Sequence, residues 1–405
     1  MTVKFPKSSR FDGEQIQIIL YGKLVDVSSW AKKHPGGVKI LRIFHQRDAT
    51  EQFEAFHSEK AKELALKMRK GALDAPKEVS QPSQSQVARD FVALKQKLVS
   101  LGFFKPNVLD EIFKVLLIVI SLAVGIYLLR AFPDNWLMFL LGATLHAFAL
   151  QQCGWVGHDY SHHSVFASPS LNDNIAKIFG SAQGLSLAWW KARHNTHHVV
   201  TNEVGNDPDI KTSPVFTFFA QSKMLNWIQK FQHIYYVPVV GLLDLYWRIE
   251  SIEYLVSRGL KYFDQILLTV VQYIFLYIVW APLGFKAFLF MSYLKGLMTG
   301  LVVFATHYAE DRLEAGTSLT FAEQNALTSR NISGGLLVDY FSGRISRQVT
   351  HHLFPMMPTS NLARADPHVR AFLNKHGIEF REDSLLGCTI RNIQALETLA
   401  DGDLH

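Results

Sequence analysis

The chain has 405 residues, of which 48% are hydrophobic and only 19% are charged. Soluble domains carry about 25% charged residues, so this shortfall, with 29 Phe and 8 Trp, indicates a membrane protein and excludes a mainly disordered chain. Two cysteines, far apart in the sequence, exclude a disulfide scaffold. The net charge of +6 is modest and contains no basic run, which favours contact with an anionic membrane surface over nucleic-acid binding.

Composition divides the chain into three parts. Residues 1–75 are mixed and charged and predict a small soluble domain, and residues 76–87, rich in Pro, Ser and Gln, predict a flexible linker. The remaining region, 88–405, contains long apolar runs. A bilayer span takes about 20 mainly apolar residues, and four runs qualify as spans: 113–132, 136–156, 265–285 and 287–306.

The charges between these spans predict the topology. Four spans place the N-terminus, the central loop 157–264 and the C-terminus on one side of the membrane. That loop carries nine Lys and Arg, whereas the opposite side offers only Arg130 and Lys286, so we expect the loop to be cytosolic. Lys295 lies inside the fourth run, where a lipid-facing charge is costly, so it either reaches the interface or faces an internal cavity.

The N-terminal domain contains two histidines in a pattern typical of haem ligation. His34 opens the motif His34-Pro-Gly-Gly, and His57 follows 23 residues later. Two histidines on separate short helices can hold a haem iron from both faces, which leaves no position for oxygen and favours electron transfer. The alternative is a turn histidine and a surface histidine.

Further residues of this domain resemble the cytochrome b5 family over residues 9–75. They are Asp26, Trp30, the triplet Asp48-Ala49-Thr50, and Phe53. The resemblance implies haem b with His34 and His57 as axial ligands. Gln46 departs from the pattern, because a glycine usually stands there.

Three histidine clusters follow in the membrane region. They are His158, His162 and His163; His194, His197 and His198; and Gln348, His351 and His352. On a helix, spacings of three and four residues bring side chains to one face. Imidazole suits iron, zinc and copper, and eight histidines exceed the ligands of one zinc, so the clusters match two metals with room for oxygen. The alternative is that polar histidines decorate interfacial helix ends.

Region 88–405 resembles the membrane fatty-acyl desaturases, and the fusion to a cytochrome b5 domain resembles the front-end subgroup, which has Gln at the position of Gln348. The resemblance implies a di-iron centre held by the eight histidines, O2 as co-substrate, and electrons from NADH through cytochrome b5 reductase. It also implies an endoplasmic reticulum membrane, with both termini and the histidine clusters cytosolic. Val349-Thr350 departs from the usual Ile-Glu, so a carboxylate is missing, and residues 344–347 depart as well.

Other polar residues near the clusters leave alternatives open. His307 stands where related enzymes need a further iron ligand, or it is an interfacial histidine bonded to a carbonyl. Asp159, Asp207 and Asp209 either orient ligand imidazoles, since metal-bound histidines usually donate their other N–H to a carboxylate or carbonyl, or are surface acids.

The sequence therefore predicts an N-terminal α+β cytochrome b5-like domain fused to an all-α integral membrane domain with about four transmembrane helices and a cytosolic histidine-bearing cap. The expected activity is front-end desaturation. A cis double bond forms between the carboxyl end and an existing double bond of a long-chain polyunsaturated acyl group, carried on CoA or a phospholipid. The alternatives are a sphingoid long-chain-base desaturase, a hydroxylase on the same scaffold, and an inert membrane-anchored electron carrier.

Overall fold

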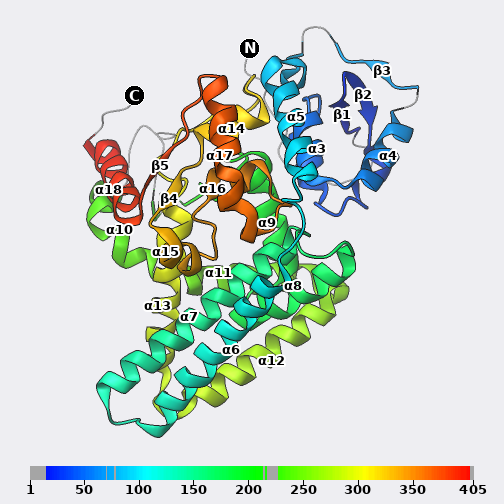
Figure 1. Ribbon diagram of the computed structural model, residues 1–405. Helices are drawn as coiled ribbons and strands as arrows, with labels where there is room; N and C mark the ends of the chain where they lie inside the picture. Colours follow the sequence, from blue (N-terminus) through cyan, green and yellow to red (C-terminus); the bar gives the residue numbers. More distant parts are fainter. Residues whose placement is uncertain (1–14, 70, 77–78, 213–214, 217–226, 402–405) are drawn as a thin grey trace.

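The computed structural model describes residues 15–69, 71–76, 79–212, 215–216 and 227–401. Long helices form a bundle at one end of the molecule, shorter helices form a cap above it, and the N-terminal domain lies beside the cap (Figure 1). This arrangement confirms the predicted combination of a small α+β domain with a helical membrane domain.

The N-terminal domain consists of a small antiparallel sheet with four short helices. The elements are β1 (Gln17–Leu20), β2 (Lys23–Asp26), β3 (Leu73–Asp74), α1 (Ser28–Ala31), α2 (Val38–Ile43), α3 (Thr50–Phe56) and α4 (Glu59–Met68). Tyr21 and Gly22 join β1 to β2 with positive φ at both positions, as a two-residue hairpin requires. Gln46 also has a left-handed backbone, with φ of 58°, which explains why a glycine is usual there.

The end of the predicted linker is ordered by contact with the N-terminal domain. The short helix η1 (Pro82–Gln84) precedes α5 (Gln86–Ser100). The backbone N–H of Ser83 donates to Asp48 Oδ2 at 3.1 Å, and the Ser83 hydroxyl reaches the same oxygen at 2.5 Å. The sequence composition predicts flexible chain over 76–87, whereas the structure begins α5 inside that range and fastens η1 to the domain before it.

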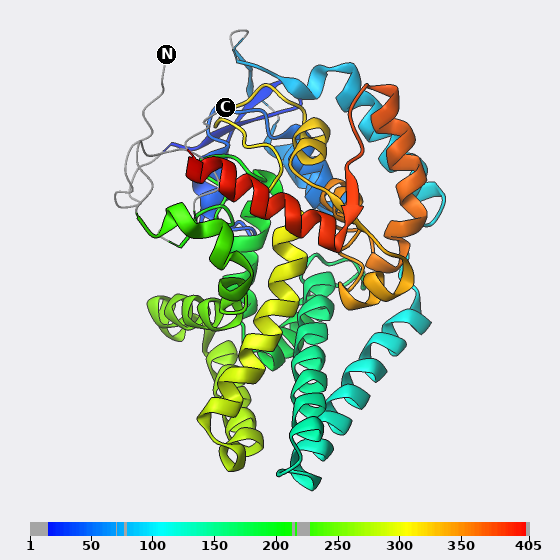
Figure 2. The same cartoon turned by 90° about the vertical axis from the view of Figure 1, so that its left-hand side faces the viewer.

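Four long helices form the bundle. They are α6 (Val108–Ala131), α7 (Trp136–Ser161), α12 (Phe263–Trp280) and α13 (Phe285–Ala305). Asn107 and Asn135 cap α6 and α7 by accepting backbone N–H bonds. Figure 2 shows α6 inclined away from its neighbours. Leu109, Ile120 and Tyr127 on this helix are exposed, as lipid-facing side chains are. Among the described residues, four helical segments are long and apolar enough to cross a membrane, which is the number predicted; the third of these segments runs from Leu243 to Leu283 and includes α12.

Lys295 of α13 faces the protein interior. Its side chain is 3% exposed and pairs with Asp244 on α11 (Leu243–Arg258), while its Nζ donates to the carbonyl of Gln183 at 2.8 Å. Arg248 donates to the other oxygen of Asp244 at 2.9 Å. Because Asp244 and Arg248 both belong to α11, the pair of Lys295 and Asp244 is the one that joins α13 to α11, and Lys295 is a structural charge.

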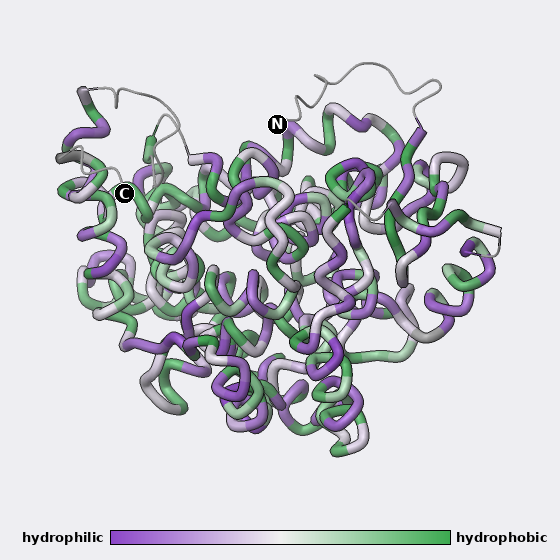
Figure 3. The backbone as a smooth tube through the Cα atoms, turned by 90° about the horizontal axis from the view of Figure 1, so that it is seen from above, coloured by the Kyte–Doolittle hydropathy of each residue, from purple (hydrophilic) through white to green (hydrophobic). Residues whose placement is uncertain are grey.

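The cap is built from short helices and a small parallel sheet. Its elements are α8 (Pro169–Gln183), α9 (Leu187–Val199), η2 (Gln229–Phe231), α10 (Gln232–Val240), η3 (Gly259–Tyr262), α14 (Phe321–Leu327), β4 (Asn331–Ser333), α15 (Gly335–Phe341), α16 (Gln348–Leu353), α17 (Thr359–Lys375), β5 (Glu382–Ser384) and α18 (Leu385–Asp401). The short helix η4 (Ala281–Leu283) instead joins α12 to α13 at the other end of the bundle. Hydrophilic stretches are spread through the cap and the N-terminal domain in the view from above (Figure 3). This polar layer covers the end of the bundle where the histidine helices meet.

Candidate active site

Three helices bring most of the predicted histidines together beneath the cap. α9 and α16 each present three polar side chains at the predicted helical spacing, while α7 carries His158 in its last turn and His162 at its C-cap. All of these histidines are at least 92% buried. Imidazoles buried to this extent need partners, and the structure places them mainly against one another.

The first cluster contains five histidines whose ring nitrogens converge. Its members are His158, His162, His194, His198 and His351. The Nε2 atoms form a chain in which each neighbouring pair is 3.0 to 3.2 Å apart. Burial lowers the pKa of four of these rings well below the usual value for histidine, so they are neutral and each offers a lone pair. The four are His162, His194, His198 and His351.

The second cluster contains His197, His307 and His352. Gln348 is the first residue of α16. Its side-chain amide nitrogen lies 2.7 Å from His307 Nε2 and 3.0 Å from His352 Nε2. His307 follows α13 directly in the chain, and the structure brings it to the same place as the predicted ligands. The two clusters together hold eight histidines: seven of the eight predicted ones and His307.

The outer nitrogens of the second cluster are held by hydrogen bonds. His197 Nδ1–H donates to Asp207 at 2.9 Å, and His307 Nδ1–H donates to the carbonyl of Thr328 at 2.8 Å. Burial by itself lowers the pKa of His197, but Asp207 and Asp209 raise it above its usual value. A carboxylate or carbonyl behind an imidazole fixes the ring and leaves Nε2 free for a metal.

His163 does not join either cluster. α7 ends at Ser161, and His163 has a left-handed backbone with φ of 57°, which turns its side chain away from the other rings. Its Nε2 lies 2.8 Å from Asp173 and 3.0 Å from Lys191, and the side chain is 27% exposed. The helical spacing used to group His163 with His158 and His162 does not apply beyond the end of the helix.

The donor set fits two iron ions. Five rings that direct Nε2 at one another cannot all be satisfied by hydrogen bonds, whereas a cation can bind several of these nitrogens at once. The buried Nδ1 atoms of His198 and His351 have no hydrogen-bond partner among the described residues, and the same is true of Gln348 Oε1. Imidazole nitrogen with an amide oxygen suits iron, and three helices supply the ligands from separate directions.

Two residues of the motif Gln348–His352 depart from the family pattern, Val349 and Thr350, and both lie on the side of α16 that faces away from the clustered histidines. Val349 is fully buried in the core between α5, α14 and α17, and the hydroxyl of Thr350 bonds to Asp366. Arg347 also pairs with Asp366, at 3.3 Å, and Arg344 forms two bonds to Asp110 at the start of α6. Asp366 therefore supplies a carboxylate beside the position where the usual Glu is missing, and the departures change packing around α16 without removing a ligand.

The two predicted haem ligands, His34 and His57, lie close together within the N-terminal domain. The rings of His34 and His57 are nearly parallel, with centroids 6.0 Å apart. With metal–nitrogen bonds of about 2 Å on each side, two imidazoles opposed across one metal have centroids about 6 Å apart. Each Nδ1–H donates to a backbone carbonyl, of Gly37 and Phe53 respectively, and burial lowers the pKa of both rings, to about 4 for His57. Both Nε2 atoms are thus available to a haem iron.

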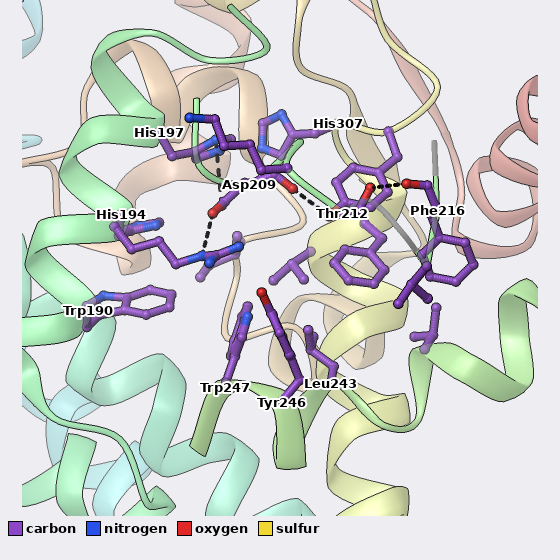
Figure 4. A pocket seen from close by; sticks show the side chains of 18 of the residues that line it. Trp190, His194, His197, Asp209, Thr212, Phe216, Leu243, Tyr246, Trp247 and His307 are labelled. Carbon is purple, nitrogen blue, oxygen red and sulfur yellow. Dashed lines mark hydrogen bonds and ion pairs between the residues drawn. The ribbon is translucent and has the colours of Figure 1, made fainter. Parts of the chain in front are cut away.

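A cavity of about 340 Å³ opens against the histidines (Figure 4). One wall carries His158, His194, His197, His307 and Gln348. The rest is mainly apolar and aromatic, and includes Trp190, Phe216, Val240, Leu243, Tyr246 and Trp247. Asp209 lies close to His197 (Figure 4), with 3.6 Å between its Oδ2 and His197 Nδ1, and its Oδ1 accepts a hydrogen bond from Arg193 at 2.7 Å. The cavity suits an apolar chain placed beside two metals.

The fold and the site define a membrane oxidoreductase in which an electron-transfer domain is fused to a histidine-rich metal centre. A family model described as "Fatty acid desaturase" matches residues 134–384, and one described as "Cytochrome b5-like Heme/Steroid binding domain" matches residues 7–74. The chain therefore belongs to the fatty acid desaturase family and carries its own cytochrome b5 domain.

Relatives of known name resemble nearly the whole chain. It is 46% identical over 400 residues to an acyl-lipid 8-desaturase of Rebecca salina, which covers 96% of this chain and 92% of that protein. It is 28% identical over 406 residues to an acyl-lipid (9-3)-desaturase of Physcomitrium patens, covering 95% and 75%. It is 29% identical over 417 residues to a Delta(6)-fatty-acid desaturase of Caenorhabditis elegans, covering 91% and 93%.

These findings confirm the front-end desaturase predicted from the sequence, with haem and a di-iron centre as its cofactors. The reported relatives give no support to the sphingoid-base alternative.

Sequence reasoning missed two side chains that orient a histidine of the second cluster, His352. His352 Nδ1 lies 3.0 Å from Asn325 Oδ1 and 3.1 Å from Thr201 Oγ1, so both residues orient this ring. Thr201 follows His198 by three residues, which is only a weak signal in the sequence. Asn325 belongs to α14 and stands in no recognisable motif, so only the fold reveals it.

Proposed function

We propose that this desaturase introduces a double bond at position 8 of a polyunsaturated acyl chain that is attached to a membrane lipid. The observation that carries the proposal is the cavity, in which an apolar groove ends on a wall of histidines from both clusters. The position and the lipid linkage follow the name of the relative that is 46% identical.

The protein positions the acyl chain and keeps water away from it. Leu243, Trp247 and Phe304 provide apolar surface along the cavity, so binding is driven by burial of methylene groups, about 0.8 kcal/mol for each one buried. His194 of the first cluster and His307 of the second cluster both line the histidine wall of the cavity (Figure 4). A fixed position of the chain decides which two adjacent carbons face the histidines, and hence which carbons lose hydrogen.

The eight clustered histidines and Gln348 are the residues that we propose hold the two irons. When bound, the irons supply the O2-dependent chemistry that removes two hydrogens from unactivated methylenes, and the haem supplies electrons one at a time. Asp207, Thr328 and Asn325 keep the ligand rings in place through their Nδ1 atoms. We propose that His163, with Asp173 and Lys191, fastens the end of α7 and does not bind metal.

The electron donor and the location extend this proposal. Cytochrome b5 reductase with NADH reduces the haem held by His34 and His57. The enzyme lies in the endoplasmic reticulum membrane, with the cap and the cytochrome b5 domain in the cytosol. The excess of Lys and Arg in the central loop supports this orientation.

Expression in yeast tests the function directly. Cells receive polyunsaturated acids whose first double bond begins three carbons beyond position 8, or three carbons beyond position 6, and the acyl chains of phospholipids and of CoA esters are analysed separately by mass spectrometry. We expect a new double bond at position 8, appearing first in the phospholipid pool. His162→Ala and His197→Ala are the inactive controls.

Other products would contradict specific parts of the proposal. A double bond at position 6 would refute the assigned position, and product appearing first in the CoA pool would refute the lipid linkage. A hydroxylated chain would show that the scaffold performs hydroxylation. A purified protein with haem but without two non-haem irons per haem would indicate the inert electron carrier.

A further inference from the structure

The cytochrome b5 domain and the metal-binding cap share one hydrophobic core. Val199 and Val200, which directly follow His198 at the end of α9, are buried among the apolar side chains of the N-terminal domain. Three residues further on, Glu203 is fully buried and accepts two hydrogen bonds from Arg47, at 2.7 and 2.9 Å. A buried charge pair of this kind is strongly destabilised when one partner leaves, so the two domains are held in one relative position.

Phe56 lies between a predicted haem ligand, His57, and a histidine of the metal site, His198. It is the last residue of α3, and its peptide bond joins it to His57. Its ring contacts the ring of His198 edge-on, with centroids 6.0 Å apart, and the ring of Phe321 in the same way at 6.2 Å. Phe56 also packs against the hydrophobic clusters of both domains.

We propose that Phe56 is the positioning residue for electron transfer from the haem to the di-iron centre within one chain. The path consists of the His57 side chain, one peptide bond, the Phe56 ring, and a single contact to the ring of His198. Among the described residues, two hydrogen-bonded contacts between the domains involve no histidine of either site. Arg47 binds Glu203, and Glu51 accepts a hydrogen bond from the backbone of Phe321.

The step assigned to this contact moves one electron and no proton. The haem becomes ferric as one non-haem iron becomes ferrous, and NADH, through its reductase, restores the ferrous haem. Two such transfers reduce the iron pair once. This inference rests on the proposed function, since it requires that the clustered histidines hold iron.

The packing around His198 gives Phe56 a second effect. The Nδ1 atom of His198 is buried and has no hydrogen-bond partner among the described residues, unlike that of His197, which is held by Asp207. The orientation of the His198 ring therefore depends on the rings packed around it, and Phe56 is the contact that comes from the cytochrome b5 domain.

Anaerobic flash reduction of the haem in the purified full-length protein tests the proposal without oxygen or product formation. The haem is reduced photochemically while the non-haem iron is ferric, and its re-oxidation is followed by haem absorbance. We expect Phe56→Leu to slow re-oxidation several-fold, and Phe56→Tyr, which keeps the aromatic ring, to restore the rate. The haem spectrum and the rate of haem reduction by NADH and reductase should be unchanged, and re-oxidation is compared at equal non-haem iron content.

Phe91→Leu is the matched control. Phe91 is fully buried and packs against Phe321 in the same core, with ring centroids 5.9 Å apart, but it contacts no histidine of the two clusters. Wild-type re-oxidation in Phe56→Leu would overturn the proposal, as would an equal slowing in Phe91→Leu, because general packing would then explain the effect. Normal re-oxidation in a wild-type protein that forms no acyl product would refute the proposed function and leave the role of Phe56 intact.

Discussion

Glu51 makes the contact between the two domains sensitive to pH. This carboxyl is 4% exposed, and its Oε2 accepts the backbone N–H of Phe321 at 3.2 Å. Burial, reinforced by the nearby carboxylates of Asp48 and Glu323, raises its pKa from the ordinary 4.5 to about 8. Since the docked form holds the proton more tightly than the exposed form, docking is favoured at low pH and weakens as the pH rises from 4.5 towards 8.

The size of the effect follows from the pKa difference. Each pKa unit corresponds to about 1.4 kcal/mol, and over the interval from pH 6 to pH 8 the docked form loses roughly 2 kcal/mol relative to a form with an ordinary carboxyl. Glu51→Gln removes the titrating group while preserving an oxygen that accepts the Phe321 N–H. The variant should therefore be more stably docked than the wild type at pH 8 and nearly equal to it below pH 5.

Hydrogen exchange at the backbone amide of Phe321 measures this directly. Exchange is compared between wild type and variant at each pH, which cancels the intrinsic pH dependence of the exchange reaction. Glu54→Gln is the control, because Glu54 lies on the same helix, pairs with Lys62, and has a pKa that is lowered. Equal loss of protection with rising pH in the wild type and in Glu51→Gln would refute the reasoning.

Three further predictions follow from the metal site, the membrane bundle and the haem domain. His307→Ala should lower the non-haem iron content by mass spectrometry, whereas His163→Ala should leave it nearly unchanged; equal losses would contradict the two-cluster assignment. Asp244→Asn leaves Lys295 buried without a counter-charge and should cost about 3–5 kcal/mol in thermal unfolding in detergent, and a cost near zero would show that Lys295 finds another partner. Gln46→Gly should stabilise the haem domain by about 1 kcal/mol, measured as resistance to haem loss in urea, because it removes a side chain from a left-handed backbone; a loss of stability would indicate that Gln46 contributes contacts that outweigh this strain.

The histidine spacing predicted which side chains share a face where a regular helix carried them. His194, His197 and His198 lie on one face of α9, as the periodicity requires, and α16 presents its three side chains in the same way. The same rule failed for His163, because nothing in the local sequence marks Ser161 as the end of α7. His307 was recognisable only by its position in the family pattern, and its convergence with His197 depends on how α13 packs.

The contact between the domains could not be predicted from composition. A segment rich in Pro, Ser and Gln is typical of flexible linkers, but composition does not reveal that Asp48 would accept two hydrogen bonds from Ser83. The pair of Arg47 and Glu203 joins residues 156 positions apart, and each residue alone looks like an ordinary surface charge. Long-range contacts of this kind leave no periodic pattern for sequence analysis to detect.

The end of α9 couples these features physically. Within seven residues, His197 and His198 serve the two metal clusters, Val199 and Val200 enter the core of the cytochrome b5 domain, and Glu203 closes the charge pair with that domain. A displacement of the haem domain should therefore shift ligands of both clusters, because the four residues between His198 and Glu203 are all buried. Fusion therefore contributes more than a high local concentration of haem. The contacts that dock the electron donor also hold His197 and His198 in the positions proposed to bind iron.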